Sequence, residues 1–495
     1  MKKIKLIVLL SITIFLTNCN KDFFDVNENP NNPTSSTPSL TLPVAEQQLL
    51  FLNSRGMNYL GNFMVDNWAV PSNWSAMQDL IRYNVTSTFY AFIFEDSYAD
   101  IIKNLTYIET YEDGIVDYSA YKVIASALKG YQYQYLVDLY GDIPYTEAGQ
   151  RAENTTPAYD KAEDVYKSVI ESLTNAATLA VNMPEIYENP DSQDFIFHGD
   201  MMEWAKFINT VKLRMLVRLS NTGQDSYIKG EIAKIDDNGA GYVDSDVLAN
   251  PGYSDSNDKQ NPFFAYLGNN AGTNSGTDRN DFTVASDYIL NVLTLNNDLR
   301  YMRLFDESDA GGYKGVYQAT ALPGEGYTSK DLSHLGPGLL ISSEQDQPLM
   351  LLSESLFLQA EAIVRGYISD GESVAKDLYE AGIEASFSFL KVPDASNEAM
   401  KYFNQDIANV GWDSSPNKIE AIITQKSIAL NGVNGIESWI ELTRTGFPSG
   451  IPIPDETDGV RPVRLIYPAS EYARNTQNVP QLTNADAFTK YPFWK

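Results

Sequence analysis

The sequence predicts a mostly α-helical protein with a loop-rich region in its middle. Apolar residues recur every three or four positions through much of residues 42–237 and again through 348–444, as on the buried face of a helix. Between these blocks, residues 238–347 are crowded with Gly, Asn, Asp and Ser, as in the run GNNAGTNSGTDRNDF. Helices therefore form the scaffold, and the irregular middle is a candidate for function, because long irregular stretches in compact proteins often carry it.

Residues 1–18 are predicted to be a lipoprotein signal peptide. Three lysines precede the apolar run Leu6–Leu16, which only Ser11 and Thr13 interrupt. A basic start followed by an apolar core of roughly 7–15 residues is typical of a secretory signal. Later segments fall short of the ~18 consecutive apolar residues that a transmembrane helix needs.

Cys19 is the single cysteine among 495 residues, so it has no partner for a disulfide within the chain. It is either a stray thiol or a site of lipid attachment. The run LTNC resembles a bacterial lipobox, although Asn18 stands where a small residue is usual. We expect Cys19 to be the acylated first residue of the mature protein, since several acyl chains anchor stably in a membrane. Residues 19–41, rich in Asn, Pro, Ser and Thr, would form a tether.

In the first helical block we expect five helices, at 42–59, 88–109, 118–140, 160–181 and 200–219. Gly141 and Pro144 follow the third and mark its end. The fifth carries its basic residues mostly off the apolar stripe, which favours a solvated face; these residues are Lys206, Lys212, Arg214 and Arg218. Lys212 and Arg214 could instead meet acids or helix ends inside the scaffold.

The rest of the chain has short helical signals at 286–293 and 299–305, and longer ones at 348–365, 372–390, 397–410, 417–430 and 435–444. A proline-containing tail, residues 445–495, follows. We therefore predict a single domain over residues 42–495. Its scaffold is 42–237 and 348–444, and its insertion is 238–347.

The net charge of −29 argues against nucleic acid as a partner, because phosphate contacts need clustered Lys and Arg. Catalytic signatures are also missing. The chain has two histidines, far apart, and lacks HExxH, GxSxG, GxGxxG and the phosphate-binding GxxxxGK[ST] loop.

Acidic residues leave two further alternatives open. Two carboxylates alone can hydrolyse a glycoside, and Asp244 with Asp246 or Asp255 with Asp258 are such pairs. With 65 acids in the chain, solvated loop residues are the favoured interpretation. The same loop acids could bind calcium, but their spacing does not fit an EF-hand, and no cofactor is predicted.

Aromatic and planar polar side chains in loops suggest a site for a neutral polar ligand. Aromatic rings stack on the apolar faces of sugars, while Asn, Asp and Arg bond to hydroxyl groups. The alternative for each tryptophan is a place in the core. The predicted ligand residues are Trp68, Asn73 and Trp74 in the early loop and Tyr253, Phe264, Tyr266, Asn269, Asp278 and Arg279 in the insertion.

Several stretches, in order along the chain, resemble the SusD/RagB family of nutrient-binding outer-membrane lipoproteins of Bacteroidetes, in a SusD-like branch. They are DVNENPNNPT, VDLYGDIPYTEA, EWAKFINTVKLRMLVRLS, SESLFLQAEAIVRG, YEAGIEASF, ALNGVNGIESWIELTRTGFP and RLIYPASEYARN. Each is weak alone, but together they span nearly the whole mature chain.

This resemblance implies a fold of tetratricopeptide-like helix pairs with an irregular region that holds the ligand. It also implies a surface-exposed lipoprotein of the outer membrane that binds without cleaving. Such a protein captures oligosaccharides, or in some members peptides, and passes them to a SusC-like TonB-dependent transporter. A surface-anchored glycoside hydrolase is the third alternative.

Overall fold

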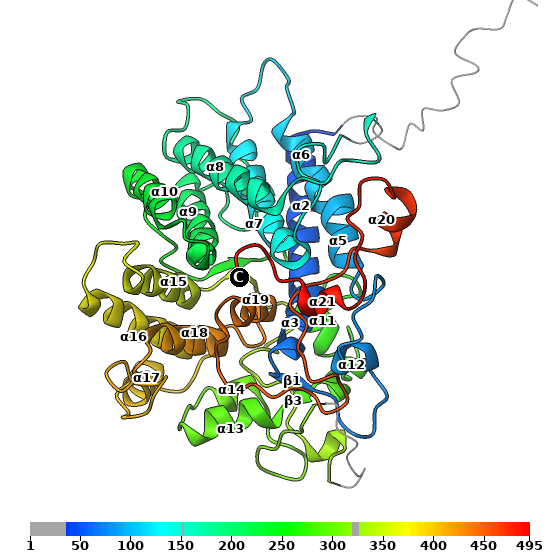
Figure 1. Ribbon diagram of the computed structural model, residues 1–495, viewed down its shortest axis with the longest axis vertical. Helices are drawn as coiled ribbons and strands as arrows, with labels where there is room; N and C mark the ends of the chain where they lie inside the picture. Colours follow the sequence, from blue (N-terminus) through cyan, green and yellow to red (C-terminus); the bar gives the residue numbers. More distant parts are fainter. Residues whose placement is uncertain (1–35, 151–152, 319–325) are drawn as a thin grey trace, which may run out of the picture.

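The computed structural model describes residues 36–150, 153–318 and 326–495, and its backbone is mostly α-helical (Figure 1). This confirms the predicted fold class. The predicted signal peptide, Cys19 and most of the predicted tether lie outside the described residues.

The chain first forms one long helical run. It consists of α2 (Pro38–Phe51), a π-helical turn η2 (Leu52–Met57) and α3 (Asn58–Met64). The run begins inside the predicted tether, because proline fits the first turn of a helix, where its missing N–H is not needed. It also continues through Gly61, beyond the predicted end at Tyr59.

The remaining helices of the first block follow in order, and α7, α8 and α9 pack as successive neighbours. Gly141, with φ of +81°, ends α7 as predicted, and the Asp200 side chain caps α9. The helices are α4 (Gln78–Ile81), α5 (Phe92–Asp96), π-helical η3 (Ser97–Ile102), α6 (Lys103–Glu109), α7 (Ser119–Tyr140), α8 (Ala162–Val181), α9 (Met201–Arg218) and α10 (Asp225–Asn238).

The second block also contains packed helix pairs, with α15 against both α16 and α18. Contacts of α15 with α9 and of α19 with α3 join the two blocks (Figure 1). Its helices are α15 (Leu352–Val364), α16 (Glu372–Phe389), α17 (Ala395–Phe403), α18 (Lys418–Ala429) and α19 (Gly435–Thr445), and the tail adds α20 (Ala469–Arg474) and α21 (Asp486–Thr489).

Two small antiparallel sheets connect the loop-rich middle to segments on either side of it. β1 (Trp68–Ala69) pairs with β3 (Val284–Ala285), and β2 (Val247–Ala249) pairs with β4 (Gln347–Met350). Strands this short leave no alternating pattern for a sequence to reveal. The middle also holds four short helices, α11 (Pro262–Leu267), α12 (Asp278–Phe282), α13 (Asp287–Leu295) and α14 (Tyr301–Leu304).

Helices α3 and α19 cross at two glycines. A Cβ atom on Gly61 would lie 2.0 Å from the backbone of Gly435, and one on Gly435 would lie 2.5 Å from the backbone nitrogen of Asn62. The two backbones approach this closely only because neither residue has a side chain.

The basic residues of α9 correct one expectation. Lys212, Arg214 and Arg218 are buried rather than solvated. Arg214 Nη1 lies 3.0 Å from Glu354 Oε1 of α15, and Lys212 Nζ lies 2.9 Å from Glu231 Oε2 of α10. For Lys212 and Arg214 this is the alternative given above, that they meet acids inside the scaffold. The favoured interpretation was wrong because their partners are on other helices, which the α9 sequence does not reveal. Lys206 pairs nearer the surface with Glu203 and Asp244.

Within the described ranges, none of the helices combines the length and apolar character needed to cross a membrane.

Candidate functional site

Trp68 lies in the core, which corrects its place among the ligand residues. Its side chain is fully buried in β1, opposite Ala285 of β3. The rings of Tyr59 and Phe63 pack on it at centroid distances of 5.7 and 6.3 Å. Because the strand alternates its faces, pairing with β3 turns this indole inward.

Trp74 is different, because part of its ring is exposed. Its Nε1 donates to Asp281 Oδ2 at 2.7 Å, and its ring lies 5.4 Å from that of Phe282, both on α12. These contacts fix the indole while leaving part of it accessible, which suits stacking on a ligand.

Asn73 joins the early loop to the end of the insertion. Its Nδ2 donates to Ser329 Oγ and its Oδ1 accepts from Ser329 N, both at 2.9 Å. These two hydrogen bonds use the carbonyl and one N–H, so Asn73 holds the loop in place beside Trp74.

Four of the predicted residues of the insertion differ in how far they are exposed. Tyr253 is nearly buried, and Phe264 is half-buried in α11. Asn269 Nδ2 donates to Asn274 Oδ1 at 3.1 Å within a local turn, and Asp278 is exposed at the start of α12. These four remain predictions as ligand contacts.

Tyr266 and Arg279 do come together, and Arg55 of η2 joins them. Arg279 Cζ lies 4.1 Å from the centre of the Tyr266 ring, and Arg55 Cζ lies 4.5 Å from it. Arg55 Cζ is also 4.1 Å from the ring centre of Phe51, which is 41% exposed. We call Phe51, Arg55, Tyr266 and Arg279 the arginine–aromatic stack, in which rings and guanidinium groups alternate.

Sequence reasoning missed Arg55 and Phe51, since both fall in a stretch that simply predicts a helix. The feature that marks Arg55 as a candidate site residue is seen only in the structure. Arg55 lies in a π-helical turn, a feature often found at functional sites, and the next residue is Gly56. A Cβ on Gly56 would lie 2.4 Å from the Phe92 ring, so glycine permits the close packing of that ring.

The guanidinium groups of the stack interact electrostatically. Burial lowers the pKa of Arg55, and the charge of Arg279 lowers it further, while Tyr266 acts in the opposite direction. Two like charges are therefore held near each other in a partly desolvated place.

A cavity of about 330 Å³ lies beside Phe51 and Arg55. Amide side chains dominate its polar lining, with one carboxylate, that of Asp258. Its other lining residues are Gln47, Asn257, Gln260, Pro262, Ala265, Asn270 and Ala271. Amides both donate and accept hydrogen bonds, as sugar hydroxyl groups do.

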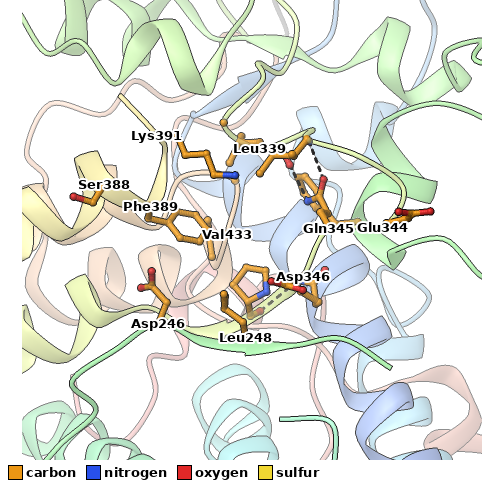
Figure 2. A pocket seen from close by; sticks show the side chains of 16 residues that line it. Asp246, Leu248, Leu339, Glu344, Gln345, Asp346, Ser388, Phe389, Lys391 and Val433 are labelled. Carbon is orange, nitrogen blue, oxygen red and sulfur yellow. Dashed lines mark hydrogen bonds between the residues drawn. The ribbon is translucent and has the colours of Figure 1, made fainter. Parts of the chain in front are cut away.

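A second cavity, of about 420 Å³, lies on another part of the insertion (Figure 2). In Figure 2, Lys391 and the Phe389 ring point into it, and Gln345 crosses one side to donate to the Leu339 carbonyl at 3.0 Å. None of the predicted ligand residues lines it.

The described part of the chain contains no group of three or more His, Cys, Asp or Glu side chains that could hold a metal ion. Three of the four acids considered as alternatives have protein partners. Asp244 pairs with Lys206, Asp246 accepts from the Leu352 N–H, and Asp255 accepts from the Gly272 N–H.

Comparison with known proteins agrees with the fold and the absence of catalytic motifs. A SusD-like family model, described as "Starch-binding associating with outer membrane", matches residues 30–468. Among curated proteins, none matches the chain.

Solved structures match over nearly the whole chain. A chitin-binding protein is 25% identical with a TM-score of 0.72, over 89% of this chain and 95% of that one. A chitin-binding SusD homologue from Flavobacterium johnsoniae is 23% identical with a TM-score of 0.72, over 88% and 94%. An outer-membrane protein from Bacteroides vulgatus, described in terms of nutrient binding, is 22% identical with a TM-score of 0.73, over 93% and 100%. These descriptions name binding proteins rather than enzymes, in agreement with the predicted non-catalytic role.

Proposed function

The chain belongs to the SusD-like family of outer-membrane-associated binding proteins, and on that premise we propose that it captures oligosaccharides at the cell surface. The ligand lies on the surface between Trp74 and the arginine–aromatic stack. The protein then delivers the ligand to a SusC-like TonB-dependent transporter.

The partly exposed indole of Trp74, held by its hydrogen bond to Asp281, is the observation that carries this proposal. An immobilised ring stacks on a sugar without a large loss of side-chain freedom. The guanidinium edges of Arg55 and Arg279 and the amides of the neighbouring cavity supply hydrogen bonds to hydroxyl groups.

Tyr266 has a different role from the one its sequence context suggests. Guanidinium groups lie over its ring, so it orients the two arginines instead of offering a bare stacking face. Asn73 fixes the loop that carries Trp74. Asn269 and Asp278 would contact only the outer parts of a longer ligand.

The division of the chain supports the same role. Residues 1–18 direct export, acylated Cys19 anchors the protein in the outer membrane, and residues 19–41 tether a single domain of residues 42–495 at the cell surface. Mass spectrometry of the mature N-terminus tests this part. Absence of an acyl group on Cys19 would contradict the anchor.

Titration calorimetry against a panel of starch, chitin and other oligosaccharides, with peptides included, tests the capture of glycans. We expect at least one oligosaccharide to bind, and to bind more weakly to Trp74→Ala. Binding of peptides alone would assign the same surface to peptide capture. If no member of the panel binds, either to the protein alone or to the protein co-purified with its transporter, the proposal is rejected.

A further inference from the structure

Among the described arginines that are at least partly buried, Arg55 and Arg279 differ from the rest, because neither makes a side-chain hydrogen bond or an ion pair within the described residues. The fully buried arginines of the described residues all form ion pairs with acids; these are Arg214, Arg218, Arg300 and Arg444. In a chain of net charge −29, acids are abundant, so two unpaired arginines side by side stand out.

Stacking leaves the hydrogen-bonding edges of both guanidinium groups free. A guanidinium group that lies over a ring uses its flat face, while its N–H donors point outward in its own plane. Cζ of each arginine is within 4.5 Å of the Tyr266 ring centre. Arg279 Nε is buried, yet it has no acceptor in the part of the protein that the structure describes.

Three acids share α12 with Arg279 or the cavity with Arg55. Asp281 Oδ2 accepts from Trp74, Asp258 lines the cavity that Arg55 also lines, and Asp278 is exposed beside Arg279 in α12. None of the three forms an ion pair with Arg55 or Arg279. The repulsion between the two arginines is therefore not relieved by an ion pair within the described residues. Burial is the main reason that the pKa of Arg55 is lowered, and the charge of Arg279 adds to it.

We propose that the arginine–aromatic stack binds an acidic group of the captured oligosaccharide, either a sugar carboxylate or a sulfate ester. This inference rests on the proposed function and narrows its ligand class. Two pre-oriented guanidinium groups match the geometry of an oxyanion, and such charge-assisted hydrogen bonds are about twice as strong as neutral ones. The anion would also relieve the repulsion between Arg55 and Arg279.

The overall negative charge does not prevent this. At physiological ionic strength, charges more than about 8 Å apart are largely screened when they are exposed to solvent. Exposed acids elsewhere on the surface therefore contribute little to the field at the two arginines. A short acidic oligosaccharide suits the site better than a long polyanion, which would run over the acidic surface beyond it.

Matched pairs of probes test the charge of the ligand. Calorimetry compares trigalacturonate with its trimethyl ester for the carboxylate, and lactose 3′-sulfate with lactose for the sulfate. We expect the acidic member of at least one pair to bind about tenfold more tightly than its neutral partner, with an affinity that falls as salt is raised.

Four variants locate the effect. Arg55→Gln and Arg279→Gln should each abolish the preference for the acidic member. Arg474→Gln removes the same charge from an exposed position in α20 and should keep that preference. Arg279→Lys keeps the charge but not the planar fork, and should keep part of the preference. Melting temperatures of all variants are measured to confirm that each is folded.

Equal binding within both pairs, including no binding to any of the four probes, overturns the inference. So does an equal loss of preference in Arg474→Gln, because the preference would then reflect net charge only. The proposed function is tested by a different result. It holds if neutral oligosaccharides bind in a manner that depends on Trp74, and it is rejected only if no member of the wider panel binds.

Discussion

Arg218 of α9 and Glu437 of α19 form a fully buried ion pair. Arg218 Nη2 lies 2.7 Å from Glu437 Oε2 and 2.8 Å from Oε1. Arg218 also contacts Glu441, and Lys426 Nζ of α18 lies 2.9 Å from Glu437 Oε1. This network joins the first helical block to the second, so it holds together the scaffold that carries the proposed ligand surface.

Arg218→Ala should lower the free energy of unfolding by about 3–5 kcal/mol, because it leaves Glu437 buried without its main partner. Urea unfolding measures the change. Lys167→Ala, which breaks an exposed pair with Glu163 in α8, is the control and should cost less than about 0.5 kcal/mol. Similar losses in the two variants would contradict the importance of burial.

The same network predicts a dependence of stability on pH. Burial opposes ionisation of Glu441, but Arg444, Lys426 and Arg218 outweigh it and hold its pKa well below the ordinary value of 4.5. A carboxyl group whose pKa is lower in the folded state stabilises the fold at pH values above its unfolded pKa. That stabilisation begins to decline as the pH falls below about 4.5 and is lost completely only below the lower pKa of the folded state.

Glu441→Gln tests this, with urea unfolding of both proteins between pH 3.5 and 7. We expect the wild-type protein to be the more stable above pH 5 and to lose that advantage progressively below it. A difference in stability that stays constant over the whole range would show that the ionisation of Glu441 is not involved.

The two tryptophans of the early loop should respond in opposite ways. Trp74→Ala should weaken ligand binding about tenfold, or on the order of 1.4 kcal/mol, with little change in melting temperature, because its ring is partly exposed. Trp68→Ala should lower the free energy of unfolding by about 3–5 kcal/mol, because it opens a cavity in the core. Calorimetry and thermal unfolding of both variants check this, and a large loss of stability in Trp74→Ala would place that residue in the core too.

Because α3 and α19 cross so closely, adding one methyl group at Gly61 should strongly lower the stability of the fold. Gly61→Ala should destabilise the fold by about 3 kcal/mol or more, since the clash is with backbone and has no easy relief. Gly230→Ala in α10 is the matched control. It meets nothing within 4 Å and should stabilise the protein by about 0.5–1 kcal/mol through helix propensity. Thermal unfolding distinguishes the two, and tolerance of Gly61→Ala would contradict the close approach.

The helices were largely predictable because the residues that favour and end a helix are close together in the sequence. The expected helix at 118–140 is α7 (Ser119–Tyr140), and Gly141 ends it with a left-handed φ. Those at 372–390 and 435–444 are α16 and α19, with ends shifted by at most one residue. Apolar periodicity and capping residues depend only on neighbours in the sequence.

The candidate site was predictable only in part. Trp74 packs on α12, the helix that also carries Arg279, and Arg279 lies over the Tyr266 ring. Trp68 is in the core, although both tryptophans occupy the same loop sequence. Which indole turns inward depends on the pairing of β1 with β3, more than 200 residues away. Arg55 belongs to the candidate site because its guanidinium group lies over the ring of Tyr266 in α11. η2 and α11 meet only when the chain folds, so the sequence around Arg55 does not show this contact.

By itself, then, the sequence determined the helices, the loop-rich middle and the family to which the chain belongs. The tertiary structure decided which charged residues are paired. Arg218 and Arg55 both lie on helices, but folding brings carboxylates to Arg218, whereas it brings aromatic rings and no ion-pair partner to Arg55 within the described residues. Pairing of charges depends on distances between segments remote in sequence, and such distances exist only once those segments have packed together.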